Sequence, residues 1–474
     1  MNTSKVAVCV ALLAVAVAPV VACESSSSSS GGIDAPDTGV FDPDGGDGGN
    51  VDPPVQSECV PPTKGPTMHQ GGSSSDPDNQ VWTADGSPHI LPYDTTIYKT
   101  VTIEPCAEVL LAAGRELTVT GKLIAEGTAT KRIHFGAKDA GQAWNNIRTL
   151  SPGTLRFAYT TLDGGGTVGN TQPYLTGVLN VAGDGSKPVQ ETLFVDHVTI
   201  AGSLSSGIVL TGNAGFAAGS NALVVKGAAQ HPMSIWARAV GGIPVGSYTG
   251  NAIDKILLPT TSGNDSFSET TTLHERGVPY LVGHATSGGD LRVYVPAGQP
   301  PVTLTIEPGV EMRFKKGGVL RVGVFTSNTP CLGSLIAAGT AAKPIVFKSD
   351  EASPAPGDWL GLAFGDVPTA IDKVDHVRVE NAGGTSTSGS GSCPDNAEVN
   401  NDGAIRISGP PPSQFITNTV IASSKTNGID RGWRSDQPVI SFLPTNMVTG
   451  VALCLETYPP TANNVCPVPV PCPQ

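Results

Sequence analysis

Residues 123–129 read Leu-Ile-Ala-Glu-Gly-Thr-Ala, and residues 335–341 read Leu-Ile-Ala-Ala-Gly-Thr-Ala. Three further pairs of segments match in the same order along the chain: TIEP at 102–105 and 305–308, KRIHF at 131–135 and KPIVF at 343–347, and FVDHVTIA at 194–201 and FITNTVIA at 415–422. Trp144 also falls near Trp359. Such self-similarity indicates a repeated architecture. It predicts two copies of one module, at residues 80–275 and 276–445.

The matched segments contain short runs of apolar and β-branched residues, such as 117–119, 123–125 and 133–135, separated by bends that contain glycine. Such runs are typical of strands, and the 58 glycines and 40 prolines of this 474-residue chain disfavour long helices. A sandwich would favour two-residue Asn-Gly or Asp-Gly hairpins, which are rare between these strands. A coil of short parallel strands, in which each turn buries its inward side chains against its neighbours, explains the pattern better.

The segments TIEPG at 305–309, LIAEGTA at 123–129 and VDHVRVENAGG at 374–384, with the Trp144 and Trp359 regions, resemble right-handed parallel β-helix repeat proteins of the pectin-lyase-like superfold. The resemblance covers roughly residues 80–445. It implies an all-β chain folded as a right-handed parallel β-helix of two duplicated modules. It says little about function, because that superfold includes lyases, hydrolases, adhesins and structural rods.

The chain begins with Lys5 and an apolar run at 6–21, which is short for a membrane-spanning helix and suits a signal peptide. The run ends in Val-Val-Ala-Cys at residues 20–23, which resembles the lipobox of bacterial lipoprotein signals. The resemblance implies that residues 1–23 are a signal peptide and that Cys23 carries the lipid. We therefore expect an exported protein anchored to a bacterial membrane, at the outer membrane or cell surface. Ordinary secretion with cleavage near Ala22 is the alternative.

Residues 24–79 are rich in Ser, Gly, Asp and Pro, a composition that cannot bury a core, and they predict a disordered linker. The Asp/Gly stretch at 42–49 superficially resembles a calcium loop but lacks the bidentate Glu of an EF-hand. We therefore expect no cofactor, with calcium as the one candidate. Residues 24–65 hold eight acidic residues against one lysine, and the whole chain has a net charge of −13, which argues against nucleic acid as a partner.

Two Asp-His pairs, Asp196-His197 and Asp375-His376, echo a dipeptide of pectate-lyase-like enzymes, although neither stands in a Trp-containing strand. The Asp-Asp pair and Gly-His-Gly of polygalacturonase-like enzymes are absent. The duplication aligns Asp375-His376 with Arg156-Phe157, and Asp196-His197 with Thr417-Asn418. Since the aligned residues differ in chemistry, these pairs fit bends between strands better than a catalytic role.

Other acidic residues offer weaker candidates. One interpretation places Asp358, beside Trp359, in a groove with Asp366, Asp372 and Asp375, where acids beside a Trp would suit sugar contact or calcium. Surface bends would give the same pattern. Glu104 and Glu307 precede a proline in both copies, and we expect them to cap turns.

Seven cysteines remain beyond Cys23, and disulfides are the default in an exported protein. We expect Cys59 to pair with Cys106, and Cys331 with Cys393. Three cysteines compete for one bond near the C-terminus: Cys454, Cys466 and Cys472. Residues 446–474, rich in Cys and Pro, and the segment before residue 80 are natural caps for the open strand edges of a coil.

These features predict a surface-displayed, lipid-anchored protein with a structural, adhesive or polysaccharide-binding role and no catalysis. The expected partners are polysaccharide or another surface protein, with the membrane contacted only through the lipid. The alternative is a divergent polysaccharide lyase or glycoside hydrolase that acts on an acidic polysaccharide, with weak catalytic candidates Asp358, Asp375, His376, Asp196 and His197.

Overall fold

The structure is a computed structural model. It describes residues 58–474, except 167–174, 261–265, 285–287, 296–297, 324, 327–328, 331, 387–391, 394–401, 435–438, 462, 464–471 and 473–474. The expected signal peptide and Cys23, Cys331 and Cys466 lie outside the described residues. The described chain is all-β apart from three short 3-10 helices: η1 (Ala84–Gly86), η2 (Ala237–Gly242) and η3 (Leu443–Thr445). In the same residues, no helix is long and apolar enough to cross a membrane.

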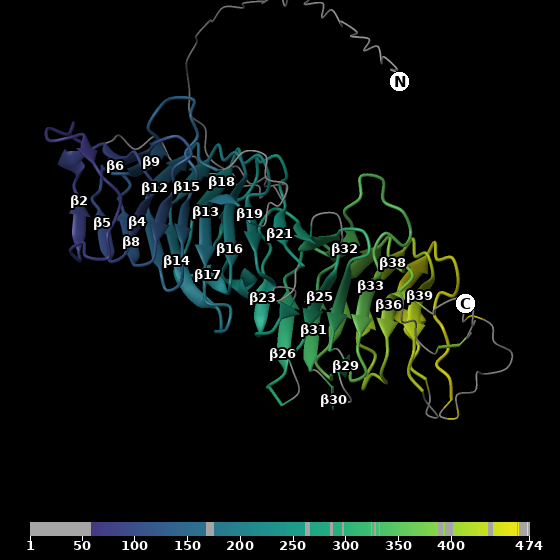
Figure 1. Cartoon of the computed structure of the whole chain (residues 1–474). Coiled ribbons are helices and arrows are strands. Elements are labelled where there is room, and N and C mark those ends of the chain that lie inside the picture. Colours follow the sequence, from purple (N-terminus) through teal and green to yellow (C-terminus); the bar gives the residue numbers. More distant parts are fainter. Residues whose placement is uncertain are drawn as a thin grey trace, which may run out of the picture. The chain divides into compact units, whose positions relative to one another are not determined.

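Strands of the first copy build three sheets in which every pairing is parallel, as Figure 1 shows. Sheet A holds β1 (Thr67–Met68), β3 (His89–Leu91), β6 (Glu108–Leu111), β9 (Ile133–Ala137), β12 (Thr160–Asp163), β15 (Thr199–Ala201), β18 (Leu223–Lys226) and β20 (Gly246–Ser247). Sheet B holds β2 (Gln80–Trp82), β5 (Thr100–Ile103), β8 (Lys122–Glu126), β11 (Thr154–Ala158), β14 (Gln190–Asp196) and β17 (Ala214–Phe216).

Sheet C begins in the first copy and continues through the second. Its strands are β4 (Thr95–Ile97), β7 (Leu117–Val119), β10 (Ile147–Thr149), β13 (Gly177–Ala182), β16 (Ser206–Thr211), β19 (Met233–Ile235), β21 (Ile256–Leu258), β24 (Tyr280–Val282), β27 (Glu311–Phe314), β32 (Ile345–Ser349), β35 (Val377–Glu380), β38 (Val420–Ala422) and β40 (Met447–Thr449).

The second copy adds two more parallel sheets. Sheet D holds β22 (Ser266–Phe267), β25 (Asp290–Val293), β28 (Val319–Val322), β33 (Gly361–Phe364), β36 (Gly403–Ile407) and β39 (Asn427–Arg431). Sheet E holds β23 (Thr271–Leu273), β26 (Val302–Ile306), β31 (Gly333–Ala338), β34 (Lys373–Asp375) and β37 (Ile416–Thr417). A short antiparallel ribbon joins β29 (Phe325–Thr326) to β30 (Thr329–Pro330).

Consecutive strands enter different sheets, and the order then repeats. After β5 in sheet B the chain enters β6 in sheet A and β7 in sheet C, and returns to sheet B with β8. In the second copy, β26, β27 and β28 visit sheets E, C and D before β31 returns to sheet E. Each turn of chain therefore adds one strand to each of three sheets, which explains the short strands and frequent bends of the sequence.

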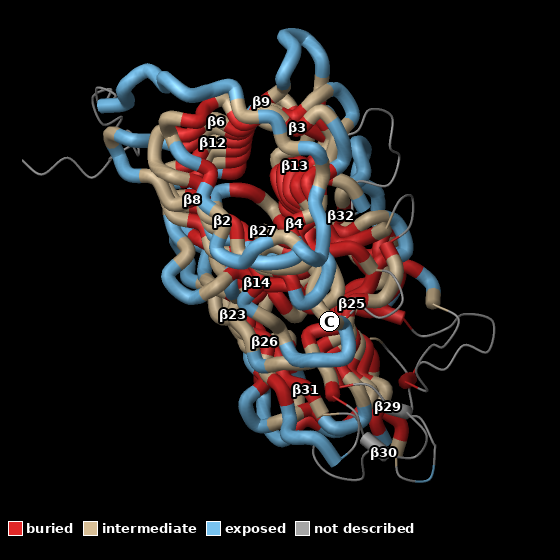
Figure 2. The backbone as a smooth tube through the Cα atoms, turned by 60° about the vertical axis from the view of Figure 1, so that its left-hand side comes forward, coloured by how far each residue is buried: buried red, intermediate tan, exposed pale blue. Residues whose placement is uncertain are grey.

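The matched segments pair in the same register in both copies. Thr102 in the TIEP segment pairs with Ile124 in LIAEGTA, and their counterparts Thr305 and Ile336 pair in the same way. Inward positions alternate with outward ones along these strands, as the buried–intermediate pattern of β5 and β26 shows. The buried side chains form one apolar cluster that extends from Trp82 to Phe442. Figure 2 shows the buried residues along the strands and the exposed ones in the connections.

Two sheets end and two new sheets begin where the two copies meet. Sheet B ends at β17 and sheet A at β20, whereas sheets D and E begin at β22 and β23, slightly before the expected boundary at residue 276. Helix η2 packs against both β17 and β23. Among the sheets of the described residues, only sheet C runs through the junction. As a result, Ile133 lies in sheet A, but its counterpart Ile345 lies in sheet C.

The expected linker is shorter than residues 24–79. Strand β1 pairs with β3, the Glu58 amide donates to the Thr130 carbonyl at 3.0 Å, and a disulfide joins Cys59 to Cys106 as expected. Pairing and a covalent link therefore order residues 58–79 despite their composition. They cover the first coil, where Gly72 packs so tightly on the Thr96 carbonyl that a Cβ would lie 1.7 Å from its oxygen.

The opposite end is closed by the C-terminal segment. Of the three competing cysteines, Cys454 pairs with Cys472. Cys393 is disulfide-bonded as well, and Cys331, its expected partner, lies outside the described residues. Glu456 bridges to the edge strand β39 at Ile429, and its buried carboxylate receives the Arg431 guanidinium at 3.3 Å. The bridge at Glu456 therefore covers part of the open edge of β39, and the ion pair with Arg431 holds the C-terminal segment against this edge.

Candidate functional site

The first Asp-His pair lies at a corner between sheets B and A. His197 follows β14 with a φ of 54°, and its Nδ1 lies 2.8 Å from the Asp196 carboxylate. Its ring stacks on Tyr159, which occupies the preceding corner with a φ of 44°. The Arg132 guanidinium donates to the His197 carbonyl. These contacts hold a left-handed corner of the chain together.

The second pair occupies a corner of the second copy between β34 and β35, one turn before the corner that corresponds to Asp196-His197. His376 has a φ of 51° and lies 3.2 Å from the Asp375 carboxylate, which also accepts bonds from Thr417 and Asn418 at 2.9 Å each. Burial raises the pKa of Asp375, but the bonds from Asn418 and Thr417 outweigh it and hold this pKa below its ordinary value. The carboxylate is thus satisfied by the chain beside it.

The register corrects one sequence alignment. Glu126 pairs with Ala158, and its counterpart Ala338 pairs with Asp375, so Asp375-His376 is equivalent to Ala158-Tyr159. The alignment with Arg156-Phe157 was therefore wrong by two residues, because insertions shift the offset between copies. The alignment of Asp196-His197 with Thr417-Asn418 is confirmed, since Ala158 pairs with Asp196 and Asp375 with Thr417.

The acids around Trp359 serve separate loops. Asp358 accepts from the Ser349 hydroxyl at 2.7 Å and the Ala355 amide at 2.8 Å. Asp372 accepts from the amides of Leu335 and Thr369, and burial raises its pKa. Asp366 is exposed. Within the described residues, no group of three or more His, Cys, Asp or Glu side chains could hold a metal ion.

The two matched glutamates cap turns, as expected. Glu104 accepts from the Ala84 amide and Glu307 from the Glu275 amide, each at 2.9 Å. Both amides lie two residues beyond the end of the preceding strand, β2 or β23. Glu307 also contacts His274 Nδ1 at 2.7 Å. The contact repeats in both copies because it belongs to the fold and not to a ligand.

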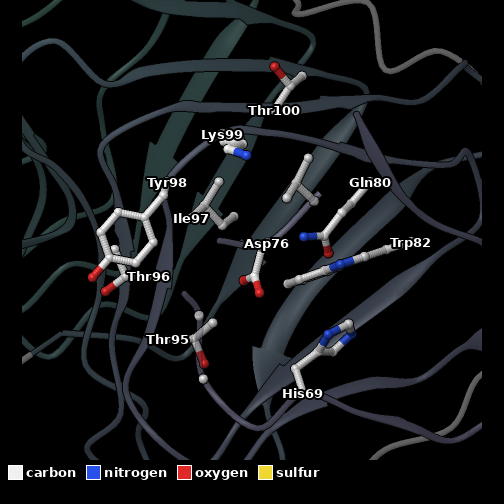
Figure 3. A pocket seen from close by; sticks show the side chains of 13 residues that line it. His69, Asp76, Gln80, Trp82, Thr95, Thr96, Ile97, Tyr98, Lys99 and Thr100 are labelled. Carbon is white, nitrogen blue, oxygen red and sulfur yellow. The ribbon is translucent and has the colours of Figure 1, made fainter. Parts of the chain in front are cut away.

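A hollow of about 350 Å³ lies near the N-terminal end, between residues 69–76 and the first coil (Figure 3). Trp82 lines it, and the buried Trp82 indole N–H has no hydrogen-bond partner. The rings of His69 and His89 pack beside it, with His69 Nε2 3.0 Å from His89 Nδ1. Burial lowers the pKa of His69 to about 4. Burial also lowers the pKa of His89 below its ordinary value. We interpret this hollow as the packing boundary between the N-terminal covering segment, residues 58–79, and the first turn of strands, and not as a ligand site.

A larger groove lies where the two copies meet, and we name it the junction groove. It offers about 820 Å³ of open space. Its lining residues come from the loops before β19, β21 and β24, from β24 and β27, and from the starts of the loops after β27 and β32: His231, Ala252, Ile253, Asp254, Lys255, Pro279, Leu281, Arg313, Lys315 and Asp350. The groove therefore combines an apolar floor with charged walls.

The apolar floor arises because an apolar residue, Leu281, occupies an outward-facing position of the sheet, where a polar side chain is usual. Leu281 alternates with the inward Tyr280 and Val282, and it pairs with the partly exposed Arg313 on the next strand. It must therefore point outward. It is nevertheless only 2% exposed, since the surrounding loops and long side chains cover it.

The walls carry an excess of cations although the protein as a whole is acidic. Lys255 pairs with Asp350, and Glu311 accepts from Arg313 at 2.5 Å and Lys348 at 3.0 Å. Burial raises the pKa of Glu311, but its bonds from Arg313 and Lys348 outweigh it and keep this pKa below the ordinary value. The lining of the groove holds three cations, Lys255, Arg313 and Lys315, against Asp254 and Asp350.

One imidazole is built into this wall. His231 is 3% exposed, and its Nδ1 lies 2.9 Å from the Lys255 carbonyl, to which it can only donate. Burial lowers the pKa of His231 to about 4. The ring is therefore neutral at pH 7, and its Nε2 is an acceptor.

The sequence did not predict this groove. No motif marks His231, Lys255, Arg313, Lys315 or Asp350, which come from separate turns. The one available signal was Leu281, an apolar residue at an outward strand position that pairs with Arg313 on the next strand. Comparison with known proteins adds no assignment: no protein family, no curated protein and no solved structure matches the chain.

Proposed function

We propose that the protein is exported, that Cys23 carries a lipid anchor, and that the parallel sheets form a right-handed β-helix displayed beyond an acidic linker. The Val-Val-Ala-Cys segment and the low-complexity residues that follow support the anchor and the linker. The three-sheet coil and the disulfides at both ends of the described chain are compatible with this arrangement. Several acyl chains would supply stable membrane attachment.

We further propose that the displayed body binds an acidic polysaccharide in the junction groove without turning it over. The observation that carries the proposal is the cationic wall over an apolar floor in a protein whose net charge is −13. Carboxylates of the sugar would meet Arg313 and Lys315, and a sugar ring would lie against the partly exposed Pro279, above the buried Leu281. Charge-assisted hydrogen bonds of this kind contribute roughly 1.5–3 kcal/mol when they are shielded from water.

Binding without turnover fits the acid–base groups better than a lyase reaction. A lyase needs a base whose pKa lies near the working pH. His231 Nε2 is the neutral acceptor in this wall, but its pKa of about 4 makes it a weak base, and its side chain is buried. Asp350 is neutralised by Lys255. The weak catalytic candidates in the Asp-His pairs hold corners elsewhere.

The proposal is tested by calorimetric titration of the full chain with an oligogalacturonate at low and moderate salt. The double variant Arg313→Gln/Lys315→Gln should bind at least tenfold more weakly, about 1.4 kcal/mol. Lys122→Gln/Lys226→Gln removes the same charge from the first copy and should bind like wild type. Salt should weaken wild-type binding.

Two results would contradict the proposal. Equal affinity of the two double variants would remove the junction groove as the site. Release of new reducing or unsaturated ends from the polymer would instead support the enzyme alternative. Thermal melts of each variant identify any loss that comes from unfolding.

A further inference from the structure

A second groove of about 820 Å³ lies on sheet A in the first copy, and we name it the glycine groove. It lies between the loop that precedes Trp144 and the row of turns that follows β12 and β15. Its lining residues are mostly small: His134, Gly136, Ala137, Ala140, Gly141, Gln142, Ala143, Asp163, Gly164, Gly202 and Leu204. The backbone therefore forms much of its surface.

The two large grooves lie on equivalent faces of the two copies. The glycine groove adjoins the loop between β9 and Trp144, and the junction groove adjoins Asp350, at the start of the loop between β32 and Trp359. Both tryptophans are buried, and each indole N–H donates to a backbone carbonyl, of Asp163 at 2.7 Å and of Glu380 at 2.8 Å. Each copy of the module thus has a groove on the same face, and the two grooves are lined by different side chains.

An imidazole–carboxylate pair is aimed into the glycine groove. His134 Nδ1 lies 3.0 Å from Glu108 Oε1 on the neighbouring strand. An ionised carboxylate only accepts, so Nδ1 carries a proton, and Nε2 accepts a hydrogen bond whenever the ring is neutral. A Cβ at Gly136 would lie 2.7 Å from His134 Cε1 and 3.0 Å from Nε2. The ring edge that bears Nε2 therefore leans over Gly136, which itself lines the groove.

The opposite wall supplies a carboxylate and an apolar side chain. Asp163 is exposed, and its Oδ1 would lie 3.5 Å from a Cβ at Gly202, so the carboxylate lies against the glycine turns. Leu204 is 40% exposed. The Trp144 bond to the Asp163 carbonyl and the Gly166 amide bond to the Asn145 carbonyl fix this wall to the loop. The groove is therefore formed in advance of any ligand.

We propose that the glycine groove binds an uncharged, hydroxyl-rich glycan. Its side chains offer acceptors, at His134 Nε2 and Asp163, together with the amide of Gln142, and among the described residues no lysine or arginine lines it. Hydroxyl groups satisfy such acceptors, whereas the carboxylates of a polyuronate would be repelled by Asp163 and the nearby Glu108. Leu204 and the bare glycine turns give a sugar ring a flat apolar surface. The inference goes beyond the junction groove, because it assigns a second ligand class to a second site.

The test titrates the full chain with uncharged gluco-oligosaccharides, glucosamine oligomers and oligogalacturonate. We expect wild type to bind the uncharged oligomers. Asp163→Asn and Gly136→Val should each weaken that binding at least tenfold, the second because its side chain displaces the His134 ring. Thr161→Val, beside His134 on the same face but outside the groove lining, should bind normally.

The outcomes separate this site from the junction groove. Arg313→Gln/Lys315→Gln should keep uncharged-glycan binding, and Asp163→Asn should keep polyuronate binding. Failure of wild type to bind any uncharged oligomer would overturn the inference, whatever the polyuronate does. Binding of glucosamine oligomers alone, lost in Asp163→Asn, would also overturn it by identifying a cation site. Circular dichroism of each variant confirms folding.

Discussion

At the residue scale, the acids that the sequence made conspicuous mostly serve the backbone. Asp196 and Asp375 sit at corners where the chain turns with a positive φ, and Glu104 and Glu307 accept backbone amides. Asp358 does the same in its loop. A coil with many bends leaves many amides without a strand partner, and side-chain acceptors satisfy them. Conspicuous acids are thus the expected cost of frequent turns.

His231 should make stability depend on pH. Its folded pKa of about 4 lies below the unfolded value of 6.5, so the folded chain resists protonation of this ring. Its contribution is complete above pH 6.5 and is lost as pH falls towards 4, by up to about 3 kcal/mol. Three charged groups also affect the pKa of His231. Lys255 and Lys315 lower it, and Asp350 raises it.

The measurement is the free energy of unfolding in urea at pH 7.5, 5.5 and 4.5. His69 and His89 change in the same direction, so the comparison is between wild type and His231→Gln, which lacks only one titrating ring. The variant should be less stable at pH 7.5 and should lose less stability on acidification. Parallel pH profiles for the two proteins would refute the assignment.

At the element scale, the duplication predicted which strands correspond but not how they pair across the junction. Short alternating runs gave the strands, and the matched Thr102–Ile124 and Thr305–Ile336 pairs confirm their register. The exchange of sheets A and B for D and E was not predictable, because it depends on η2 and on two short strands, β22 and β23, without a repeat signature. The junction groove, which forms there, was missed for the same reason.

The matched tryptophans provide a test of equivalence between the copies. Trp144→Phe and Trp359→Phe each remove a buried indole N–H that donates to a backbone carbonyl, whereas Trp82→Phe removes one without a partner. All three changes shrink a buried ring. The first two should therefore cost about 1–2 kcal/mol more than the third. Chemical denaturation measures this difference, and equal losses at all three sites would show that the two hydrogen bonds add nothing.

At the scale of the whole molecule, the described residues form two sets of parallel sheets that share one continuous sheet. Sheets A and B belong to the first copy and sheets D and E to the second, so sheet C and η2 carry much of the coupling. In coiled repeats each turn is stabilised mainly by its neighbours. If the coupling at the junction is weak, the two copies should therefore unfold as separate units. The sequence predicted the two copies, but the single shared sheet is a finding of the structure.

Phe135 and Phe347 occupy matched positions, and both are fully buried. Replacement of either by Ala should cost about 3–5 kcal/mol. Phe347→Ala should raise amide hydrogen exchange, measured by mass spectrometry in native buffer, in sheets D and E and in β27–β40, with little change in sheets A and B. Phe135→Ala should give the reverse pattern, because its lost contacts lie in the first copy. If either variant raised exchange evenly through all five sheets, the junction would transmit stability fully and the molecule would unfold as one unit.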